Sequence, residues 1–489
     1  MKRQNSFRRS ILLAAFLIPW IFCLCDCALG SLISDSSVFR YMGWRYATGT
    51  GGYRHAWDCK GPVLVLFNAL GYRLGISPSV IFAALWSGIV FMFFRFLKRL
   101  RVVESEGWTL LFLLSFLQMG GWKLMNGTET IATFFSLLAI HSVWGTRSPL
   151  RWMAVGAAAG AVFFTKANLI AFAAALGLAC AVKSFQTRDF LRLTKCFFCS
   201  LAGFAAVVAV ISLLFRDNGY REMWDATIGY NILERCAGVT QSYLAFWAHS
   251  VFQKNLSLAE TASFFGWLVL GASLLGLGCF KALRAADDRK PAFLALTLWL
   301  ILEMSMVFCS KGFYLHYTLV SLVPMLALLS LCVSDSRLVI CRGRMLCILS
   351  LVCLPPSALC VRHIVLHAKW SNTVSSFVEE VAKVVPPGER VAVLGSHTTT
   401  EIMTRLHLMT DQKYFSWLFY EKNCFDDRRE EHRAEFQRAR ESCKWLLSER
   451  DMGADGLVRV CRVNGYKVFV YQNTNSTSSP TSRPNQPPF

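Results

Sequence analysis

Long apolar runs recur along this chain and constrain its fold more than any other feature. A helix needs about 20 predominantly apolar residues to cross the hydrocarbon core of a membrane. The runs predict about eleven such spans, at residues 10–30, 78–96, 107–121, 130–145, 150–165, 168–183, 196–215, 262–280, 291–309, 316–333 and 345–362. With 54% hydrophobic and 17% charged residues, the chain is also too apolar for an ordinary soluble protein. We therefore expect an α-helical polytopic membrane protein.

The basic residues predict how these spans are oriented. The chain carries 51 Lys and Arg residues against 31 Asp and Glu residues, a formal net charge of +20. Most of the basic residues lie in short clusters between apolar runs, and such clusters are retained on the cytoplasmic side of a membrane. The basic flank of the first run therefore predicts a cytoplasmic N-terminus. Because membrane orientation accounts for the clusters, we do not expect nucleic-acid binding.

Two apolar runs need a separate interpretation. The run Ile11–Leu29 follows basic residues, as the core of a signal peptide does, but more apolar runs follow at once. This favours an uncleaved first span. The run Val63–Gly75 is too short to span comfortably, so we interpret it as an interfacial helix on the outer face. Counting it as a span would place the later basic clusters outside.

The C-terminal part has a different composition and is predicted to form a second domain. Residues 1–365 would form the membrane domain, residues 366–472 a small α/β domain and residues 473–489 a disordered tail rich in Asn, Ser, Thr and Pro. Because the N-terminus is predicted to be cytoplasmic and the number of spans is odd, the second domain should lie on the outer, extracytoplasmic side of the membrane. Its patterns predict a buried strand, an amphipathic helix and an alternating strand, at Arg390–Gly395, Arg428–Leu447 and Tyr466–Tyr471.

Two outer loops hold most of the polar residues that could carry chemistry. The first loop, residues 31–77, contains acids, bases, aromatics and a glycine cluster between two apolar segments. Asp35 follows the first span directly, and Lys60 precedes the next apolar run. Such a loop suits a site for a phosphate and a hydroxyl, although solvated charges and belt aromatics are the plainer alternative. The second loop, residues 216–261, is polar and aromatic, and we expect it to cover the site.

The end of the first loop resembles a motif of the membrane-embedded C-type glycosyltransferases. It reads Asp58-Cys59-Lys60-Gly61-Pro62-Val63, where that family commonly has Asp-x-Lys-Pro-Pro-Leu. Thr165-Lys166 at the end of a glycine-rich span and His316-Tyr317 at the head of a late span are similar to the same family. The most similar branches are the bacterial dolichyl-phosphate-mannose protein mannosyltransferases and the lipid A aminoarabinose transferases. The resemblance covers roughly residues 10–335, and Gly61 in place of proline is expected to loosen the turn.

The resemblance implies an inverting sugar transfer on the outer face of the membrane. Short loops and a compact tail favour a bacterial plasma (inner) membrane over the endoplasmic reticulum. The donor would be a polyprenyl-phosphate sugar, and the acceptor a hydroxyl of a protein, a lipid or a polysaccharide. Inverting transfer needs a general base for the acceptor proton. It also needs cationic groups that stabilise the charge developing on the leaving phosphate.

Asp35 and Lys60 are the leading candidates for these two roles. Asp35 is the expected catalytic base, and the alternative is a helix cap formed by Ser34-Asp35-Ser36. Lys60 is the expected first ligand of the donor phosphate, and the alternative is a snorkelling surface lysine.

Six further residues complete the candidate site. The additional donor-phosphate candidates are Arg40, Arg45, Lys166 and His316. Glu129 is a candidate second acid or acceptor-binding group because an ionisable residue at a span start is a functional candidate by default. Asp58 is assigned an orienting or acceptor-binding role. Arginines beside lipid headgroups and interfacial histidines are common, so structural uses stay open for Arg40, Arg45 and His316.

The sequence predicts no cofactor with certainty. Glu129 and Asp35 could share a divalent cation, but two carboxylates without a third ligand do not define a metal site. A transporter or flippase of lipid-linked sugars is the main alternative function. We find no internal repeat of the kind such transporters show, and the polar candidates gather at the outer ends of spans. A scaffold without chemistry is a further alternative.

Overall fold

The computed structural model of the chain describes residues 2–29, 34–56, 58, 60–118, 126–145, 148–234, 258–284, 289–308, 318–335, 368–395, 397–412, 429–449, 451–452, 457–463 and 466–473. The span predicted at 345–362, residue His316 and the tail from residue 474 onward lie outside these ranges. All structural statements below concern the described residues.

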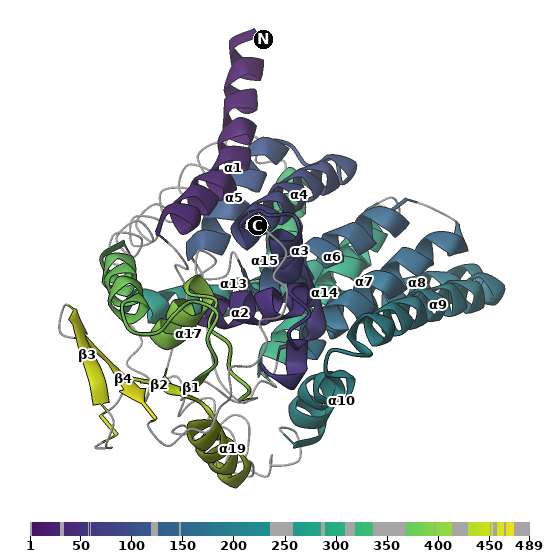
Figure 1. The fold of residues 1–489 in the computed structure, drawn as a ribbon. Helices are drawn as coiled ribbons and strands as arrows, with labels where there is room; N and C mark the ends of the chain where they lie inside the picture. Colours follow the sequence, from purple (N-terminus) through teal and green to yellow (C-terminus); the bar gives the residue numbers. More distant parts are fainter. Residues whose placement is uncertain are drawn as a thin grey trace.

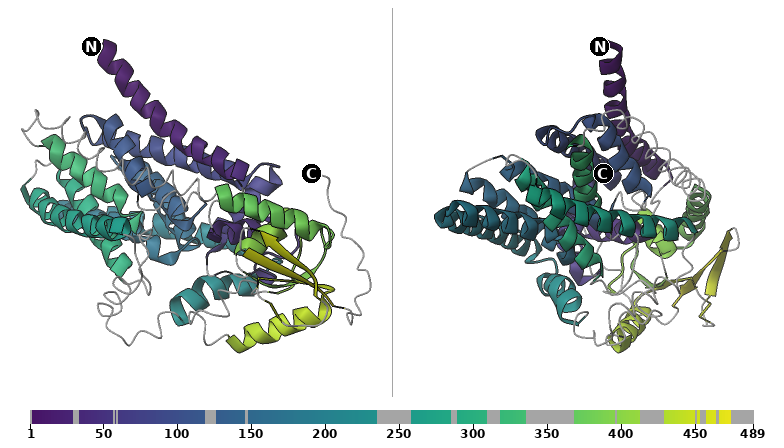
Figure 2. Two further views of the ribbon diagram at one scale, coloured as in Figure 1. Left: turned by 90° about the vertical axis from the view of Figure 1, so that its left-hand side faces the viewer. Right: turned by 180° about the vertical axis from the view of Figure 1, so that it is seen from behind.

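The described chain is mostly helical, with a small sheet near the C-terminus (Figures 1 and 2). The α-helices are α1 (Lys2–Leu29), α2 (Ser34–Ala47), α3 (Pro62–Arg73), α4 (Pro78–Arg99), α5 (Ser105–Gln118), α6 (Thr128–Val143), α7 (Trp152–Phe163), α8 (Ala171–Thr187), α9 (Phe190–Phe215), α10 (Tyr220–Trp224), α13 (Leu258–Arg284), α14 (Lys290–Phe308), α15 (Leu322–Asp335), α17 (His397–Arg405) and α19 (Arg429–Ser442). Short 3₁₀ helices are η1 (Gly52–Arg54), η3 (Pro149–Arg151) and η4 (Ala167–Leu169), and η5 (Asp225–Glu234) is a π-helix. A further helix without a label covers residues 368–382.

Five helices of the described chain are long and apolar enough to cross a membrane. They are Arg8–Cys27, Pro78–Arg99, Ala167–Thr187, Phe190–Phe215 and Gly266–Arg284. Each corresponds to a span predicted from the sequence, so the prediction of a helical multi-pass membrane protein is confirmed at this level. Shorter apolar helices correspond to further predicted spans, at Ser105–Leu117, Thr128–Val143, Pro149–Phe163 and Leu322–Ser334.

Local sequence signals explain where several of these helices begin. The Ser77 side chain accepts a hydrogen bond from the Ser79 N–H at 3.3 Å, and Pro78 occupies the first helical position of α4. At the start of α9, the Asp189 carboxylate accepts the Arg192 N–H at 3.1 Å. These caps satisfy backbone donors that the helices themselves leave unpaired.

Helices α7 and α9 pack closely because glycines face each other's backbone. A Cβ atom on Gly156 would lie 1.7 Å from the Ser200 carbonyl oxygen, and one on Gly203 would lie 2.0 Å from the Met153 carbonyl oxygen. Small residues allow membrane helices to approach in this way. The two helices are therefore in close contact at these glycines.

The segment 220–234, which lies in the predicted second outer loop, is helical. Helix α10 begins after Gly219, whose φ of 92° lies in the left-handed region, and η5 continues from it. Met223 and Ala226 are fully buried, so apolar residues at helical spacing give this segment a packed face. The rest of the predicted loop, from residue 235 to residue 257, lies outside the described residues.

The C-terminal part forms a four-stranded mixed sheet of β1 (Val391–Leu394), β2 (Trp445–Ser448), β3 (Leu457–Val463) and β4 (Tyr466–Gln472). The strand order is β1-β2-β4-β3; β1 and β2 are parallel, and the other neighbours are antiparallel. The predicted strands at Arg390–Gly395 and Tyr466–Tyr471 are confirmed as β1 and β4. Helix α19 packs against β1.

The predicted helix Arg428–Leu447 is wrong at its C-terminal end. Helix α19 ends at Ser442, and Trp445–Ser448 forms the strand β2. All four residues of β2 are buried, and the strand pairs with β1 on one side and β4 on the other. A short apolar run buried between two strands lacks the alternation that identifies an exposed strand.

The C-terminal part rests directly on α2. Helix α17 packs against α2, as Figure 1 shows at the centre of the molecule. The Tyr41 hydroxyl donates to the Leu408 carbonyl oxygen at 3.3 Å and accepts the Thr410 N–H at 3.2 Å. The Trp44 ring stacks on the His407 ring with their centroids 5.4 Å apart. The α/β part and the first outer loop therefore share a packed interface.

Candidate functional site

The first outer loop turns sharply after α2 and returns to the helical bundle. Gly49, Gly51 and Gly52 have φ values of 69°, 138° and 41°, a left-handed backbone that glycine adopts without penalty. The carbonyl oxygen of Thr50, within this turn, accepts a hydrogen bond from the Arg45 guanidinium at 3.2 Å. The glycine cluster thus folds the loop back toward the start of α3.

The segment Lys60–Val63 is bonded through its backbone to the end of α7. The Gly61 N–H donates to the Thr165 carbonyl oxygen at 3.0 Å, and the Val63 N–H donates to the Phe164 carbonyl oxygen at 3.1 Å. A Cβ atom on Gly61 would lie 1.9 Å from the Phe164 oxygen. A proline here would have neither the N–H nor the space. The expectation that Gly61 merely loosens the turn is therefore wrong.

Two further bonds fix the backbone of Lys60. Its N–H donates to Asp58 Oδ1 at 2.8 Å, and its carbonyl oxygen accepts a hydrogen bond from the Tyr53 hydroxyl. Asp58 therefore holds the Lys60 backbone in place. Asp58 and Lys60 are partly buried, and Gly61, Pro62 and Val63 are buried.

Glu129 and Lys166 form a buried ion pair beside this segment. Lys166 Nζ lies 2.9 Å from Glu129 Oε1, and the Thr128 hydroxyl donates to Glu129 Oε2 at 2.8 Å. The Glu129 side chain is only 2% exposed, and that of Lys166 is 15% exposed. Lys166 directly follows Thr165, the residue whose carbonyl oxygen binds Gly61. Three predicted site residues therefore lie at or next to this junction: Lys60 and Lys166 are chain neighbours of Gly61 and Thr165, and Glu129 binds Lys166.

Arg45 and Arg40 both lie on buried parts of α2 and are used structurally. Arg45 Nη1 donates to the Tyr41 hydroxyl at 3.2 Å and to the Thr410 carbonyl oxygen at 3.0 Å. These bonds tie α2 to the C-terminal part. Arg40 forms a salt bridge with Asp26 of α1 and donates to the Ser79 hydroxyl of α4 at 2.6 Å.

The structure describes Asp35 only in part and does not describe His316. Asp35 is the second residue of α2, and the structure describes its backbone but not its side chain. A carboxylate in the first turn of a helix is favoured by the helix dipole, whatever else it does. His316 lies outside the described residues.

Several contributors to the site were missed by the sequence reasoning. Asn68 of α3 and Asn126, which precedes α6, exchange two side-chain hydrogen bonds of 3.0 and 2.7 Å. Both are buried, and the pair joins α3 to the segment that carries Glu129. An isolated asparagine in the apolar helix α3 was the available signal, because a buried amide needs partners. Asp26, an acid within the first predicted span, also binds Arg40 and Ser79.

Among the described residues, no group of three or more His, Cys, Asp or Glu side chains could hold a metal ion. Within this part of the chain, Glu129 is bound to Lys166 and Thr128. The described residues therefore provide no third ligand for the divalent cation that Glu129 and Asp35 could share.

Comparison with known protein families and with curated protein sequences finds no match to this chain.

Proposed function

We propose that the chain is an inverting glycosyltransferase that uses a polyprenyl-phosphate sugar and acts on the outer face of the plasma membrane. In this proposal the chain has the C-type glycosyltransferase fold with about eleven spans, a cytoplasmic N-terminus and an extracytoplasmic α/β part. The acceptor is a hydroxyl group of a protein, a lipid or a polysaccharide.

The observation that carries the proposal is the junction between Lys60–Val63 and the end of α7. Two backbone hydrogen bonds across this junction join Gly61 and Val63 to Thr165 and Phe164, so Lys60 and Lys166 are chain neighbours of directly bonded residues although they are far apart in the sequence. In this proposal the two ammonium groups bind one phosphate, whose negative charge they stabilise. The buried Glu129 carboxylate fixes the Lys166 ammonium at 2.9 Å, so its position is set before any donor arrives.

The proposed mechanism divides the work between Asp35 and the lysines. Asp35 removes the proton from the acceptor hydroxyl, and the acceptor oxygen then forms its bond to the sugar carbon. As the bond from that carbon to the phosphate oxygen breaks, its electron pair leaves with the phosphate. Lys60 and Lys166 stabilise the resulting charge. Phosphate leaves readily, so no separate general acid is required.

A binding experiment tests the phosphate site directly. Lys60→Ala should weaken binding of a polyprenyl-phosphate sugar by about 1.5–3 kcal/mol, the usual value of a hydrogen bond to a charged group. Binding of the phosphate-free polyprenol should be unchanged, since it lacks the group that Lys60 binds. Lys60→Arg should retain part of the affinity. Equilibrium binding of radiolabelled lipids to purified protein provides the measurement.

Lys369→Ala is the matched control because Lys369 is exposed on the helix at residues 368–382, away from the junction. It should bind both lipids like the wild type. Equal affinity of wild type and Lys60→Ala for the phosphate lipid would remove Lys60 from the phosphate site.

A further inference from the structure

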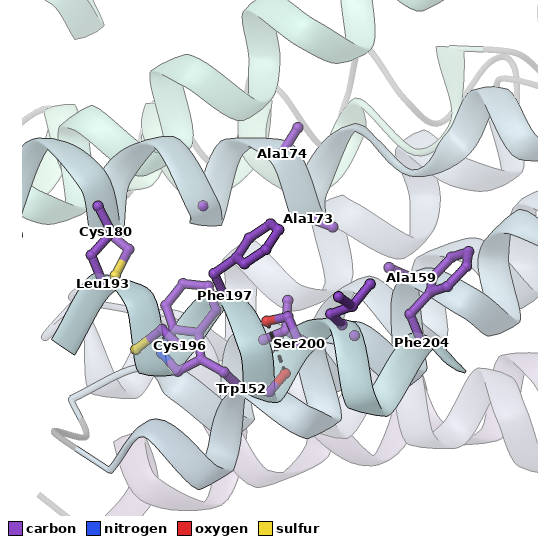
Figure 3. A pocket seen from close by; sticks show the side chains of 14 residues that line it. Trp152, Ala159, Ala173, Ala174, Cys180, Leu193, Cys196, Phe197, Ser200 and Phe204 are labelled. Atoms are coloured by element: carbon purple, nitrogen blue, oxygen red, sulfur yellow. Dashed lines mark hydrogen bonds between the residues drawn. The ribbon is translucent and has the colours of Figure 1, made fainter. Parts of the chain in front are cut away.

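An apolar groove lies between α8 and the closely packed pair of α7 and α9 (Figure 3). Its volume is about 420 Å³, and its lining is almost entirely apolar. Such a volume lies within the range of small-molecule sites. The groove is lined by other residues than the Lys60 junction and does not depend on the proposed function.

Small residues make this groove. The floor includes Gly156 and Ala159 of α7, and the α8 wall includes Ala173, Ala174 and Gly177. A Cβ atom on Gly177 would meet no other atom within 4 Å, so α8 stands away from its neighbours at this point. By contrast, Gly156 is in close contact with α9. The groove is therefore the space left where two helices pack tightly and the third does not.

The groove is open on its α9 side to the surroundings of the bundle. Phe197 and Leu201 line it and are 62% and 51% exposed. Figure 3 shows the Phe197 ring between α9 and the small residues of α8. Both α8 and α9 belong to helices long and apolar enough to span a membrane. What surrounds such helices is lipid, so a hydrocarbon chain is the chemically matched occupant.

Basic residues stand at one end of the groove, where α8 turns into α9. Leu193 and Cys196 line this end, and each is the direct neighbour of a basic residue, Arg192 and Lys195 respectively. On α8, Lys183 lies one turn beyond the lining residue Cys180 and on the same face. The acid at this turn, Asp189, already accepts a hydrogen bond as the cap of α9.

We propose that the groove binds one acyl chain of an anionic phospholipid, whose headgroup lies at the basic α8–α9 turn. Clusters of Lys and Arg at the end of membrane helices attract anionic headgroups electrostatically. A basic cluster by itself binds only the headgroup. The apolar groove provides a second binding site, for the acyl chain of the same lipid. By the predicted orientation, the lipid belongs to the cytoplasmic leaflet.

Photocrosslinking in nanodiscs tests the proposal. The protein is placed in phosphatidylcholine discs that contain a small fraction of phosphatidylglycerol with a diazirine midway along one acyl chain. A second preparation carries the same diazirine on phosphatidylcholine. Peptide mass spectrometry should find the label concentrated on residues 173–204, with the anionic probe labelling several-fold more than the neutral one.

Two variants separate the chain from the headgroup. Gly177→Phe fills the groove and should reduce labelling of residues 173–204 by both probes at least tenfold. Replacement of Lys183, Arg192 and Lys195 by glutamine should leave labelling by the neutral probe unchanged. It should also abolish the preference for the anionic probe, since each lost charge near a headgroup weakens attraction roughly fivefold.

The controls make the same chemical changes on α13. Gly276, like Gly177, has no atom within 4 Å of a built Cβ, so Gly276→Phe should leave labelling of residues 173–204 unchanged. Lys281→Gln with Arg284→Gln should likewise preserve the headgroup preference. Labelling that is spread evenly over α9 and α13 and is insensitive to Gly177→Phe would show that the groove does not bind the acyl chain. Equal labelling of residues 173–204 by both probes in the wild type would overturn the headgroup assignment.

Discussion

At the residue scale, Gly61 contributes both its N–H group and its missing side chain to the junction between the first outer loop and α7. The N–H donates to Thr165, and the space where a side chain would stand is filled by the Phe164 carbonyl oxygen. Its φ and ψ of −74° and 162° are ordinary extended values, so only the contact restricts this position.

Gly61→Ala should therefore destabilise the protein by about 1–3 kcal/mol, the usual cost of forcing an extra carbon into a packed site. It should also weaken donor binding, because Lys60 is displaced from Lys166. Gly177→Ala is the control and should leave both properties near the wild type, since its Cβ meets no atom within 4 Å. Thermal unfolding in detergent and the lipid-binding measurement would report the two effects. Wild-type behaviour of Gly61→Ala would show that the junction is not close-packed.

The candidate site was partly predictable from the residues alone. The motif around Lys60 and the acid Glu129 at a span start were recognised because each is a local signal. The pairing of Glu129 with Lys166 was not predicted, since it joins two helices and depends on how they pack. Similarly, nothing local indicates that Asn68 and Asn126 meet. Contacts between elements are set by tertiary packing, which a local pattern does not record.

At the element scale, a buried ion pair joins α1, α2 and α4. Asp26 and Arg40 are 9% and 8% exposed, and Ser79 at the start of α4 hydrogen-bonds to both. Removing one partner of a buried pair leaves the other charge uncompensated, which costs about 3–5 kcal/mol. This network gives Arg40 a structural role that does not require a donor lipid.

Arg40→Gln and Asp26→Asn should each destabilise the protein by up to about 3–5 kcal/mol, the cost of breaking a buried ion pair. The double variant Asp26→Leu with Arg40→Met, which leaves no unpaired charge, should lose less than the sum of the two single variants. Unfolding in detergent gives the comparison. Unchanged stability of Arg40→Gln together with weakened donor binding would instead favour a phosphate role for Arg40.

The elements themselves were predicted with uneven success. Span-length helices such as α4 and α9 were found because their apolar content is a property of the segment alone. The strand β2 was assigned to a helix because its four residues are all buried and do not alternate. The helical segment after Gly219 was assigned to a loop because its aromatic residues also suit an interface.

At the scale of the whole molecule, the C-terminal part packs against the first outer loop. Residues of the sheet, such as Val393 and Val470, belong to the same buried apolar cluster as Tyr41 and Leu64 of the loop region. Figure 2 shows this part gathered at one end of the helices. The division of the chain by composition did not indicate this shared core, because composition says nothing of which surfaces meet.

The predicted orientation can be tested on exposed residues. Glu389, before β1, and Arg284, at the end of α13, are both exposed. In intact cells, Glu389→Cys should react with an impermeant thiol reagent more than the parent chain does, whereas Arg284→Cys should react only after the cells are opened. This follows from basic clusters on the inside and an odd number of spans. The opposite pattern would place the Lys60 junction in the cytoplasm and exclude the proposed site.

In the proposed mechanism, Asp35 takes the acceptor proton during sugar transfer. Comparing Asp35→Asn with the wild type in membranes supplied with polyprenyl-phosphate sugars labelled in the sugar tests this role. Asparagine keeps the shape and a capping oxygen but cannot accept the proton. Transfer should therefore fall by roughly 10² or more, while folding and donor binding stay near the wild type. Asp411→Asn, at an exposed acid of the C-terminal part, should transfer normally. Transfer by Asp35→Asn at the wild-type rate would contradict the account, and Glu129 would then be the next acid to test.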